Sequence, residues 1–138
     1  MTTKKEYKSW IIDLGFDKSE FDEIYATMQT ETDFNVGDYR FIRDSDIEQI
    51  FRDEILSDEQ AIGCCAPWFI ASILEVPISA IEKIQKADCI EALGILIKAQ
   101  KPDEYVEKLA NTDGYGSHFA TYDGEEHNFG DWYAFRCN

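Results

Sequence analysis

The spacing of hydrophobic residues changes at Gly114, and this change limits the folds that the chain can adopt. Before Gly114, apolar residues recur every three or four positions, as in residues 7–14, which is typical of amphipathic helices. After it, residues 117–122 and 132–137 alternate about a glycine-rich turn, which is typical of a β-hairpin. The chain is therefore expected to combine a helical first part with a short antiparallel sheet.

Capping and helix-breaking residues divide the helical part into segments. Ser45 with Glu48 and Ser79 with Glu82 match the pattern of a capping box, and Pro67 is expected to force a helix to break or start afresh. We predict an α+β fold in which N-terminal and central helices pack on a small antiparallel sheet closed by a C-terminal β-hairpin. The expected helices are residues 3–14, 19–29, 45–56, 58–76, 80–100 and 103–110, and the expected strands are residues 39–43, 117–122 and 132–137.

The length of 138 residues predicts a single domain over residues 1–138. No apolar run approaches the roughly 20 residues of a membrane-spanning helix, and the N-terminus lacks the apolar stretch of a signal peptide. The four cysteines are then expected to be reduced thiols, which predicts a cytoplasmic protein. Nothing in the composition predicts a cofactor.

The net charge of −15 argues against direct binding to nucleic acid or to an anionic membrane, and it favours attraction to basic surfaces. Solubility alone is the competing interpretation. The acids recur three or four residues apart on predicted helices, so they line a face, and aromatic residues of the tail add a recognition surface or small pocket. The predicted binding residues are Glu20, Asp22, Glu23, Asp44, Asp46, Glu48, Asp53, Glu54, Asp58, Glu59, Tyr115, Tyr122, Trp132 and Tyr133. The expected partner is a basic protein or a nucleic-acid-binding host protein, and the oligomeric state is left open.

The segment QAIGCCAPWF, with a histidine and an asparagine downstream, resembles papain-like cysteine hydrolases. A thiol just before a helix would have its thiolate favoured by the helix N-terminus. The resemblance assigns the oxyanion-hole, nucleophile, base and orienting roles to Gln60, Cys65 (or Cys64), His118 and Asn138. The chain departs from that family because two residues separate Cys65 from Trp68 and because Asn138 is terminal. Small apolar core residues are the competing interpretation of the two cysteines.

Two further patterns are weaker. Residues 67–86 resemble a repressor-type helix-turn-helix in their apolar positions Ala71, Val76, Ile81 and Ile84, with Ser79 as the cap of the second helix. Glu75 replaces the usual turn glycine, and Pro77 is a second departure. Its expected exposed residues, Glu82, Lys83, Gln85 and Lys86, are nearly neutral together, so we interpret the segment as a packing unit and not as a DNA reader.

The two histidines of the tail raise the question of a metal site. His118 and His127 lie near acids of the same segment, namely Asp123, Glu125, Glu126 and Asp131. Nine residues across a flexible turn do not form a recognised ligand spacing, so we predict a solvated turn and no metal.

The segments DYRFIRDSDIEQIFRDEI, AIGCCAPWFIA, DGYGSHFATYDGEE and YAFRCN, spread over residues 38–138, are similar to those of small acidic proteins carried by phages and prophages. That resemblance implies a protein that binds and blocks a host protein, for instance an inhibitor of restriction or CRISPR-type defence. Spaced carboxylates on a rigid scaffold can also imitate duplex phosphates. We therefore expect a non-catalytic binding protein, as a DNA mimic or host-defence inhibitor, with a small cysteine hydrolase as the alternative.

Overall fold

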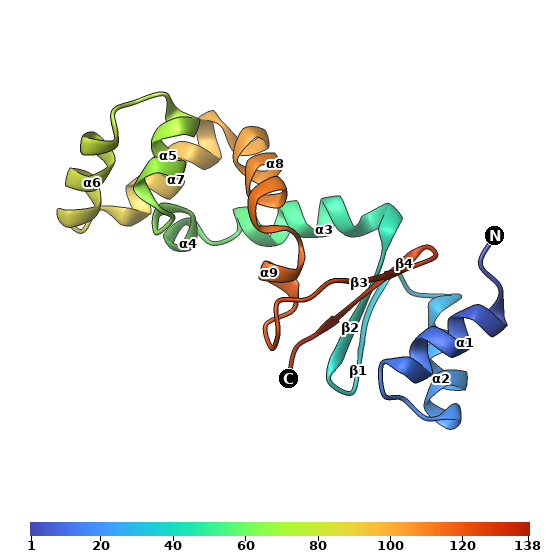
Figure 1. Cartoon of the computed structure of the whole chain (residues 1–138). Coiled ribbons are helices and arrows are strands. Elements are labelled where there is room, and N and C mark those ends of the chain that lie inside the picture. Colours follow the sequence, from blue (N-terminus) through green and yellow to red (C-terminus); the bar gives the residue numbers. More distant parts are fainter. The chain divides into compact units, whose positions relative to one another are not determined.

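The computed structural model describes all 138 residues and has the predicted α+β fold (Figure 1). A four-stranded antiparallel sheet, closed by a C-terminal hairpin, accompanies nine helices. The helices are α1 (Lys4–Asp13), α2 (Lys18–Met28), α3 (Asp44–Leu56), α4 (Glu59–Gly63), α5 (Pro67–Leu74), α6 (Ile78–Lys86), α7 (Ile90–Gln100), α8 (Pro102–Asp113) and α9 (Gly116–Phe119), and the strands are β1 (Asp33–Val36), β2 (Tyr39–Arg43), β3 (His127–Phe129) and β4 (Trp132–Arg136).

Two compact units make up the chain. Unit 1 comprises Met1–Gln49 and Tyr115–Asn138, and unit 2 comprises Ile50–Gly114. Unit 1 holds the sheet with α1, α2, α9 and the start of α3, whereas unit 2 is entirely helical. The sequence predicts one domain and does not anticipate this division.

The sheet of unit 1 has the strand order β1-β2-β4-β3, so the last strand of the chain pairs with β2 in its interior. Tyr39 lies opposite Arg136, and Ala134 lies opposite both Phe41 and His127. Successive side chains of a strand point to opposite faces. The register therefore divides the strand residues into two faces, each with its own cover.

One face of the sheet packs against α1 and α2. Phe41, Trp132 and Ala134 are buried in one cluster with residues of these helices, including Ile11 and Phe21. Both helices begin at capping boxes, made by Thr3 with Glu6 and by Asp17 with Glu20. The boxes satisfy N–H groups that would otherwise have no intrahelical partner.

The other face of the sheet lies under the segment around α9. Phe135 is fully buried there, and the ring of Phe119 lies 5.0 Å from its ring. The ring of Tyr133 stacks on that of Phe135 at 5.8 Å, and the ring of Tyr115 meets that of Tyr133 edge to face. The aromatic residues of the tail therefore complete the core of unit 1 on this side.

Unit 2 packs α4 to α8 around its own core, which includes Ile62, Ile70 and Leu93. Helices α4 and α7 approach each other through two buried glycines. A Cβ atom on Gly94 would overlap the backbone carbonyl of Glu59, and one on Gly63 would overlap the backbone of Ile90. Only glycine permits so close an approach of two backbones.

Several predicted boundaries need correction. Residues 117–122 do not form a strand, because residues 116–119 make the helical turn α9 and the hairpin instead uses β3, with its turn at Gly130 and Asp131. Residues 33–36 form β1, which the sequence analysis left out, and they join β2 through Gly37 at a φ of 56°. A tight turn that requires positive φ makes this second hairpin.

The long central helices are interrupted. The expected helix 58–76 breaks into α4 and α5 before Pro67, as the proline predicts. The expected helix 80–100 breaks into α6 and α7, with Asp88 at a φ of 62° between them. A positive φ cannot occur inside a right-handed helix, so Asp88 fixes the break.

Candidate binding surface

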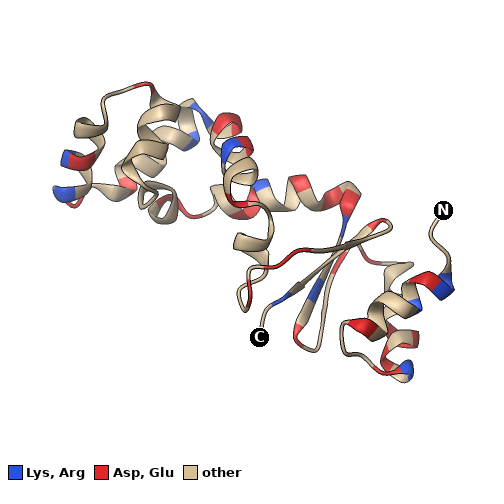
Figure 2. Cartoon of the chain, in the orientation of Figure 1, with Lys and Arg blue, Asp and Glu red and all other residues tan.

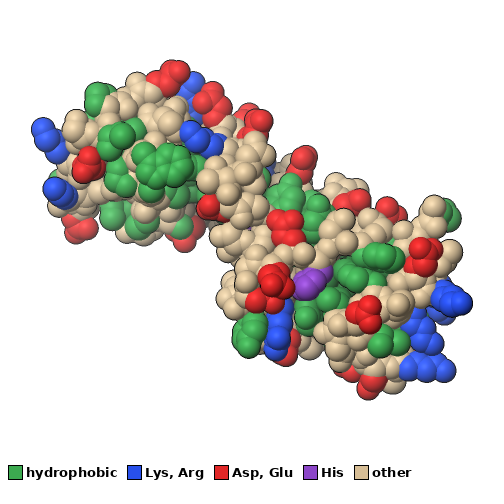
Figure 3. Space-filling model, viewed as in Figure 1, with side chains coloured by type: hydrophobic (Ala, Val, Ile, Leu, Met, Phe, Trp, Pro, Cys, Tyr) green, Lys and Arg blue, Asp and Glu red, His purple; other side chains and the backbone are tan.

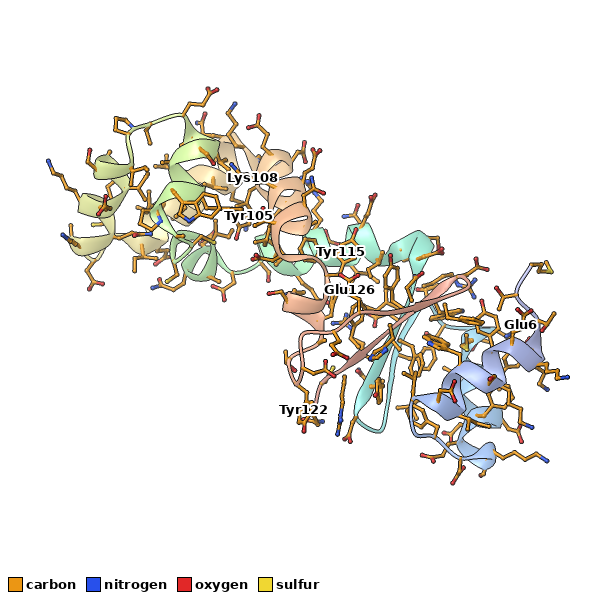
Figure 4. The ribbon with its side chains drawn as sticks, viewed as in Figure 1. Glu6, Tyr105, Lys108, Tyr115, Tyr122 and Glu126 are labelled. Carbon is orange, nitrogen blue, oxygen red and sulfur yellow. The ribbon has the colours of Figure 1, made fainter.

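The carboxylate of Glu126 organises the tail of unit 1. Its Oε1 accepts hydrogen bonds from the N–H groups of Tyr115 at 2.6 Å and of Gly116 at 3.1 Å, the first groups of α9. Figure 4 shows Glu126 beside Tyr115. A Cβ atom on Gly116 would overlap the carbonyl of Gly124. The two segments are therefore held together by a carboxylate cap and by a glycine that lets them approach.

Two tyrosines lie next to this cap. The rings of Tyr115 and Tyr133 meet edge to face with 5.9 Å between their centroids. Each side chain is half-buried, so part of each ring contributes to the surface. Ring contacts with Phe119 and Phe135 hold the pair in place. The pair therefore presents a rigid aromatic surface.

Acidic residues at the start of α3 lie within electrostatic reach of these tyrosines. The pKa of Tyr115 is raised by burial first, and then by the charge of Glu48, the neighbouring Tyr133 and the charge of Glu126. The pKa of Tyr133 is raised by burial first, and then by the charges of Glu126 and Asp44. We call these five residues, Asp44, Glu48, Tyr115, Glu126 and Tyr133, the acidic tyrosine patch.

The surface of the acidic tyrosine patch is anionic and aromatic together. None of the ion pairs in the structure involves Asp44, Glu48 or Glu126. Figure 3 has the same orientation as Figure 4. It shows acidic and hydrophobic side chains next to each other at the place where Figure 4 labels Tyr115 and Glu126. Carboxylates attract ammonium and guanidinium groups, and tyrosine rings accept cations on their faces. The patch therefore presents two kinds of group that attract lysine and arginine side chains.

The patch brings together four of the predicted binding residues, Asp44, Glu48, Tyr115 and Tyr133, from distant parts of the chain. Glu126 was absent from the predicted binding set. Its role depends on N–H groups ten and eleven residues earlier, and no local sequence pattern signals such a contact. The patch thus arises from the fold and not from one helix face.

The remaining predicted acids have separate roles or positions. Glu20 belongs to a capping box, Asp58 caps α4, and Glu59 pairs with Lys98 at 3.5 Å. Asp22, Glu23 and Asp53 are exposed, whereas Asp46 and Glu54 are half-buried. Figure 2 shows acidic residues on many elements of the chain, so acidity alone does not single out a site.

The other two predicted aromatic residues differ sharply in exposure. The side chain of Trp132 is 2% exposed and belongs to the core beneath α1 and α2, so it cannot line a recognition face. Tyr122 is 61% exposed, and the guanidinium of Arg136 lies 4.1 Å from the centre of its ring. The alternation of apolar and polar residues does not distinguish Trp132 from Tyr122, because it does not tell which face of a strand the helices cover.

The thiol of the cysteine alternative lies between α4 and α5. The Sγ of Cys65 is 3.4 Å from the hydroxyl of Tyr105 and 3.7 Å from the carbonyl oxygen of Ala61. Burial raises the pKa of the Cys65 thiol, and the hydrogen bond with Tyr105 only partly opposes this effect. The shift is opposite to the activation expected of a nucleophile before a helix.

We expect Cys65 to be alkylated by iodoacetamide more slowly than the exposed Cys64 at pH 7.5. The thiolate is the reacting form, and a raised pKa reduces its population while burial limits access. Mass spectrometry of a peptide containing both cysteines, with fragmentation between them, measures the two rates. Faster labelling of Cys65 than of Cys64 would revive the catalytic interpretation.

The other residues of the catalytic interpretation are distributed between the two units. Gln60 is exposed on α4 in unit 2, together with Cys65, whereas His118 and Asn138 belong to unit 1. The ring of His118 lies 4.7 Å from that of Phe119. Asn138 is exposed, and its backbone carbonyl accepts a hydrogen bond from Nε of Arg136 at 2.8 Å. The assignment of a catalytic set stays a prediction.

The segment that resembles a helix-turn-helix forms the pair α5 and α6. Glu75 takes the left-handed conformation at φ 58°, where such motifs usually have glycine. The α6 helix begins after Pro77 and has no side-chain cap. The prediction that Ser79 caps this helix is therefore wrong. The side-chain amide of Gln85 is not available to contact DNA bases, because its Nε2 donates hydrogen bonds to the carbonyl oxygens of Gly63 and Cys65. The packing interpretation of this segment agrees with that contact.

None of the helices combines the length and apolar character that crossing a membrane requires. Comparisons of the chain with models of protein families, with curated proteins and with solved structures found no match.

Proposed function

We propose that this chain is a non-catalytic binding protein that docks through its acidic tyrosine patch onto a basic surface of a partner protein. The observation that carries the proposal is the pair of half-buried tyrosines in unit 1, on which the negative charges of Asp44, Glu48 and Glu126 act. These five residues come from three separate parts of the chain. No basic partner within the chain pairs with the three acids.

Each part of the patch has a role in such docking. The net charge of −15 attracts a basic surface over several ångströms and speeds its encounter. The tyrosine pair then supplies rigid contact area, since tyrosine is enriched among the residues that dominate binding energy. Glu126 has a double role, because it carries charge and also holds Tyr115 and the start of α9 in place.

The specific form of this function that we propose is a DNA mimic of phage type that blocks a nucleic-acid-binding host protein. Asp44 and Glu48 are one helical turn apart, which spaces their positions by roughly 6 Å along the axis. Proteins that hold nucleic acid present arginines and lysines to successive phosphates. A host-defence protein of this kind is expected to lose its DNA when it binds the patch.

We expect the double variant D44N/E48Q to bind an arginine-rich peptide about three to ten times more weakly than the wild type. The variant removes two charges and keeps the side-chain shapes, and each exposed charge pair contributes roughly 0.2–1 kcal/mol. A fluorescently labelled deca-arginine peptide is the probe, and fluorescence anisotropy at several salt concentrations is the measurement. The affinity of the wild type should fall as salt rises, and that of the variant should fall less steeply.

The matched control is D22N/E23Q, which removes two exposed charges from α2 in the same unit. It should bind the peptide nearly as tightly as the wild type. In NMR spectra of the full chain, the peptide should shift the amide signals of residues 44–48, 115–116, 126 and 133. Equal weakening by both double variants, or shifts centred on α2, would contradict a role for the patch.

A further inference from the structure

Three metal-ligating residues gather on the segment that leads into β3. Asp123, Glu125 and His127 alternate along the chain, and one ligand atom from each lies within 4.8 Å of the others. The cluster belongs to unit 1 and shares no residue with the acidic tyrosine patch. Imidazole and carboxylate together form a mixed donor set, which distinguishes this cluster from the many groups of acids alone.

Neighbouring residues hold the donors near these positions. The imidazole of His127 is 29% exposed, and its ring contacts that of Tyr39 edge to face at 6.2 Å. Its Nε2 lies 4.0 Å from Oε2 of Glu125. The N–H of Glu125 donates to Oδ1 of Asp123 at 3.0 Å, which fixes the turn between the two carboxylates. The three side chains are therefore gathered before any ligand is added.

The aromatic neighbour of His127 borders a cavity in unit 1. Tyr39 also lines a cavity of about 290 Å³, together with Phe16, Asp38 and Arg136. Arg136 is the positively charged residue of the cavity lining. Its guanidinium lies over the Tyr122 ring, and its Nε donates a hydrogen bond to the carbonyl oxygen of Asn138. Tyr39 is thus the residue that links the cluster to this cavity, and the three donors themselves lie outside the cavity lining.

We propose that Asp123, Glu125 and His127 bind one divalent first-row metal ion. Such an ion takes its nitrogen and oxygen ligands at roughly 2.0–2.2 Å, which places donors about 3 Å apart. The flexible carboxylates must therefore close by one to two ångströms. Two carboxylates and one imidazole suit Mn²⁺, Fe²⁺ or Zn²⁺, and water molecules complete the coordination of a three-ligand site. Binding would tie the segment after α9 to the edge strand of the sheet.

Mn²⁺ is the probe for the test, because carboxylates suit it whereas the thiols of the four cysteines suit softer metals. The full chain, labelled with ¹⁵N, is titrated with MnCl₂, and paramagnetic broadening of the amide signals is followed. Residues 122–128 should broaden first, at less than one equivalent. The variant H127A should lower the Mn²⁺ affinity at least about tenfold, while H118A, which alters the other histidine of unit 1, should not.

A second variant keeps the test decisive if H127A does not fold. D123N/E125Q retains the histidine and should also lose the selective broadening. The proposal is overturned if H127A binds Mn²⁺ as tightly as the wild type. It is overturned equally if broadening spreads over the acidic helices in both proteins, since that result shows weak binding to the general negative charge only.

Discussion

Replacing Gly94 by alanine is expected to lower the free energy of unfolding of unit 2 by about 3 kcal/mol. The added Cβ would overlap the backbone carbonyl of Glu59, and a backbone atom cannot turn aside as a side chain can. Helices α4 and α7 must then separate, which opens the core around Leu93 as well. The melting temperature of unit 2 should fall by about 12–24 °C, measured by circular dichroism.

The sign of the G94A effect is the decisive part of this prediction. Where a glycine inside a helix has no close neighbours, replacing it by alanine stabilises the helix by about 1 kcal/mol. An increase in stability would therefore contradict the close approach of α4 and α7. The comparison variant is G124A, where no atom lies within 4 Å of the added Cβ and only the positive φ of 72° opposes the change, at a cost of about 1 kcal/mol.

Replacing Trp132 by alanine is expected to lower the free energy of unfolding by about 3–5 kcal/mol. The indole is 2% exposed, contacts the ring of Phe34 at 5.6 Å and lies under the guanidinium of Arg43 at 4.8 Å. Its removal leaves a cavity beneath α1 and α2. Urea denaturation, followed by circular dichroism and by the emission of the remaining tryptophans, measures the loss.

The matched control is Y122A, which removes an aromatic side chain from the same unit. Tyr122 is 61% exposed, so the expected loss is below about 1 kcal/mol, mostly from its contact with Arg136. If both variants lost the same stability, the assignment of Trp132 to the core and of Tyr122 to the surface would be wrong. If W132A kept its stability and lost binding, the original interpretation of Trp132 as a recognition residue would stand.

The helical part of the fold was predictable because its signals are local. The spacing of apolar residues in α1 and α2 depends on a few neighbouring positions, and so does the effect of Pro67. The strand β2 was predicted with its observed bounds, 39–43. The segment 117–122 was mistaken for a strand because its alternation also fits one helical turn, and the turn is fixed by Glu126, whose contact with residues 115 and 116 is not local.

The candidate site was predictable only in part, for the same reason. Asp44 and Glu48 were identified from their spacing, and Tyr115 and Tyr133 from the composition of the tail. Their convergence depends on the pairing of β4 with β2 and on the cap at α9, which join distant segments. Trp132 was misplaced because strand alternation gives two faces without telling which one a helix covers.

The interior position of β4 has a consequence for the order in which the two units fold. Residues 132–136 follow unit 2 in the chain, and the sheet of unit 1 has no continuous pairing without them. Unit 2 is continuous in sequence and helical, and such local structure forms early. Because Tyr133 lies on β4, the acidic tyrosine patch is complete only when β4 has paired with β2, a strand about 90 residues earlier in the chain.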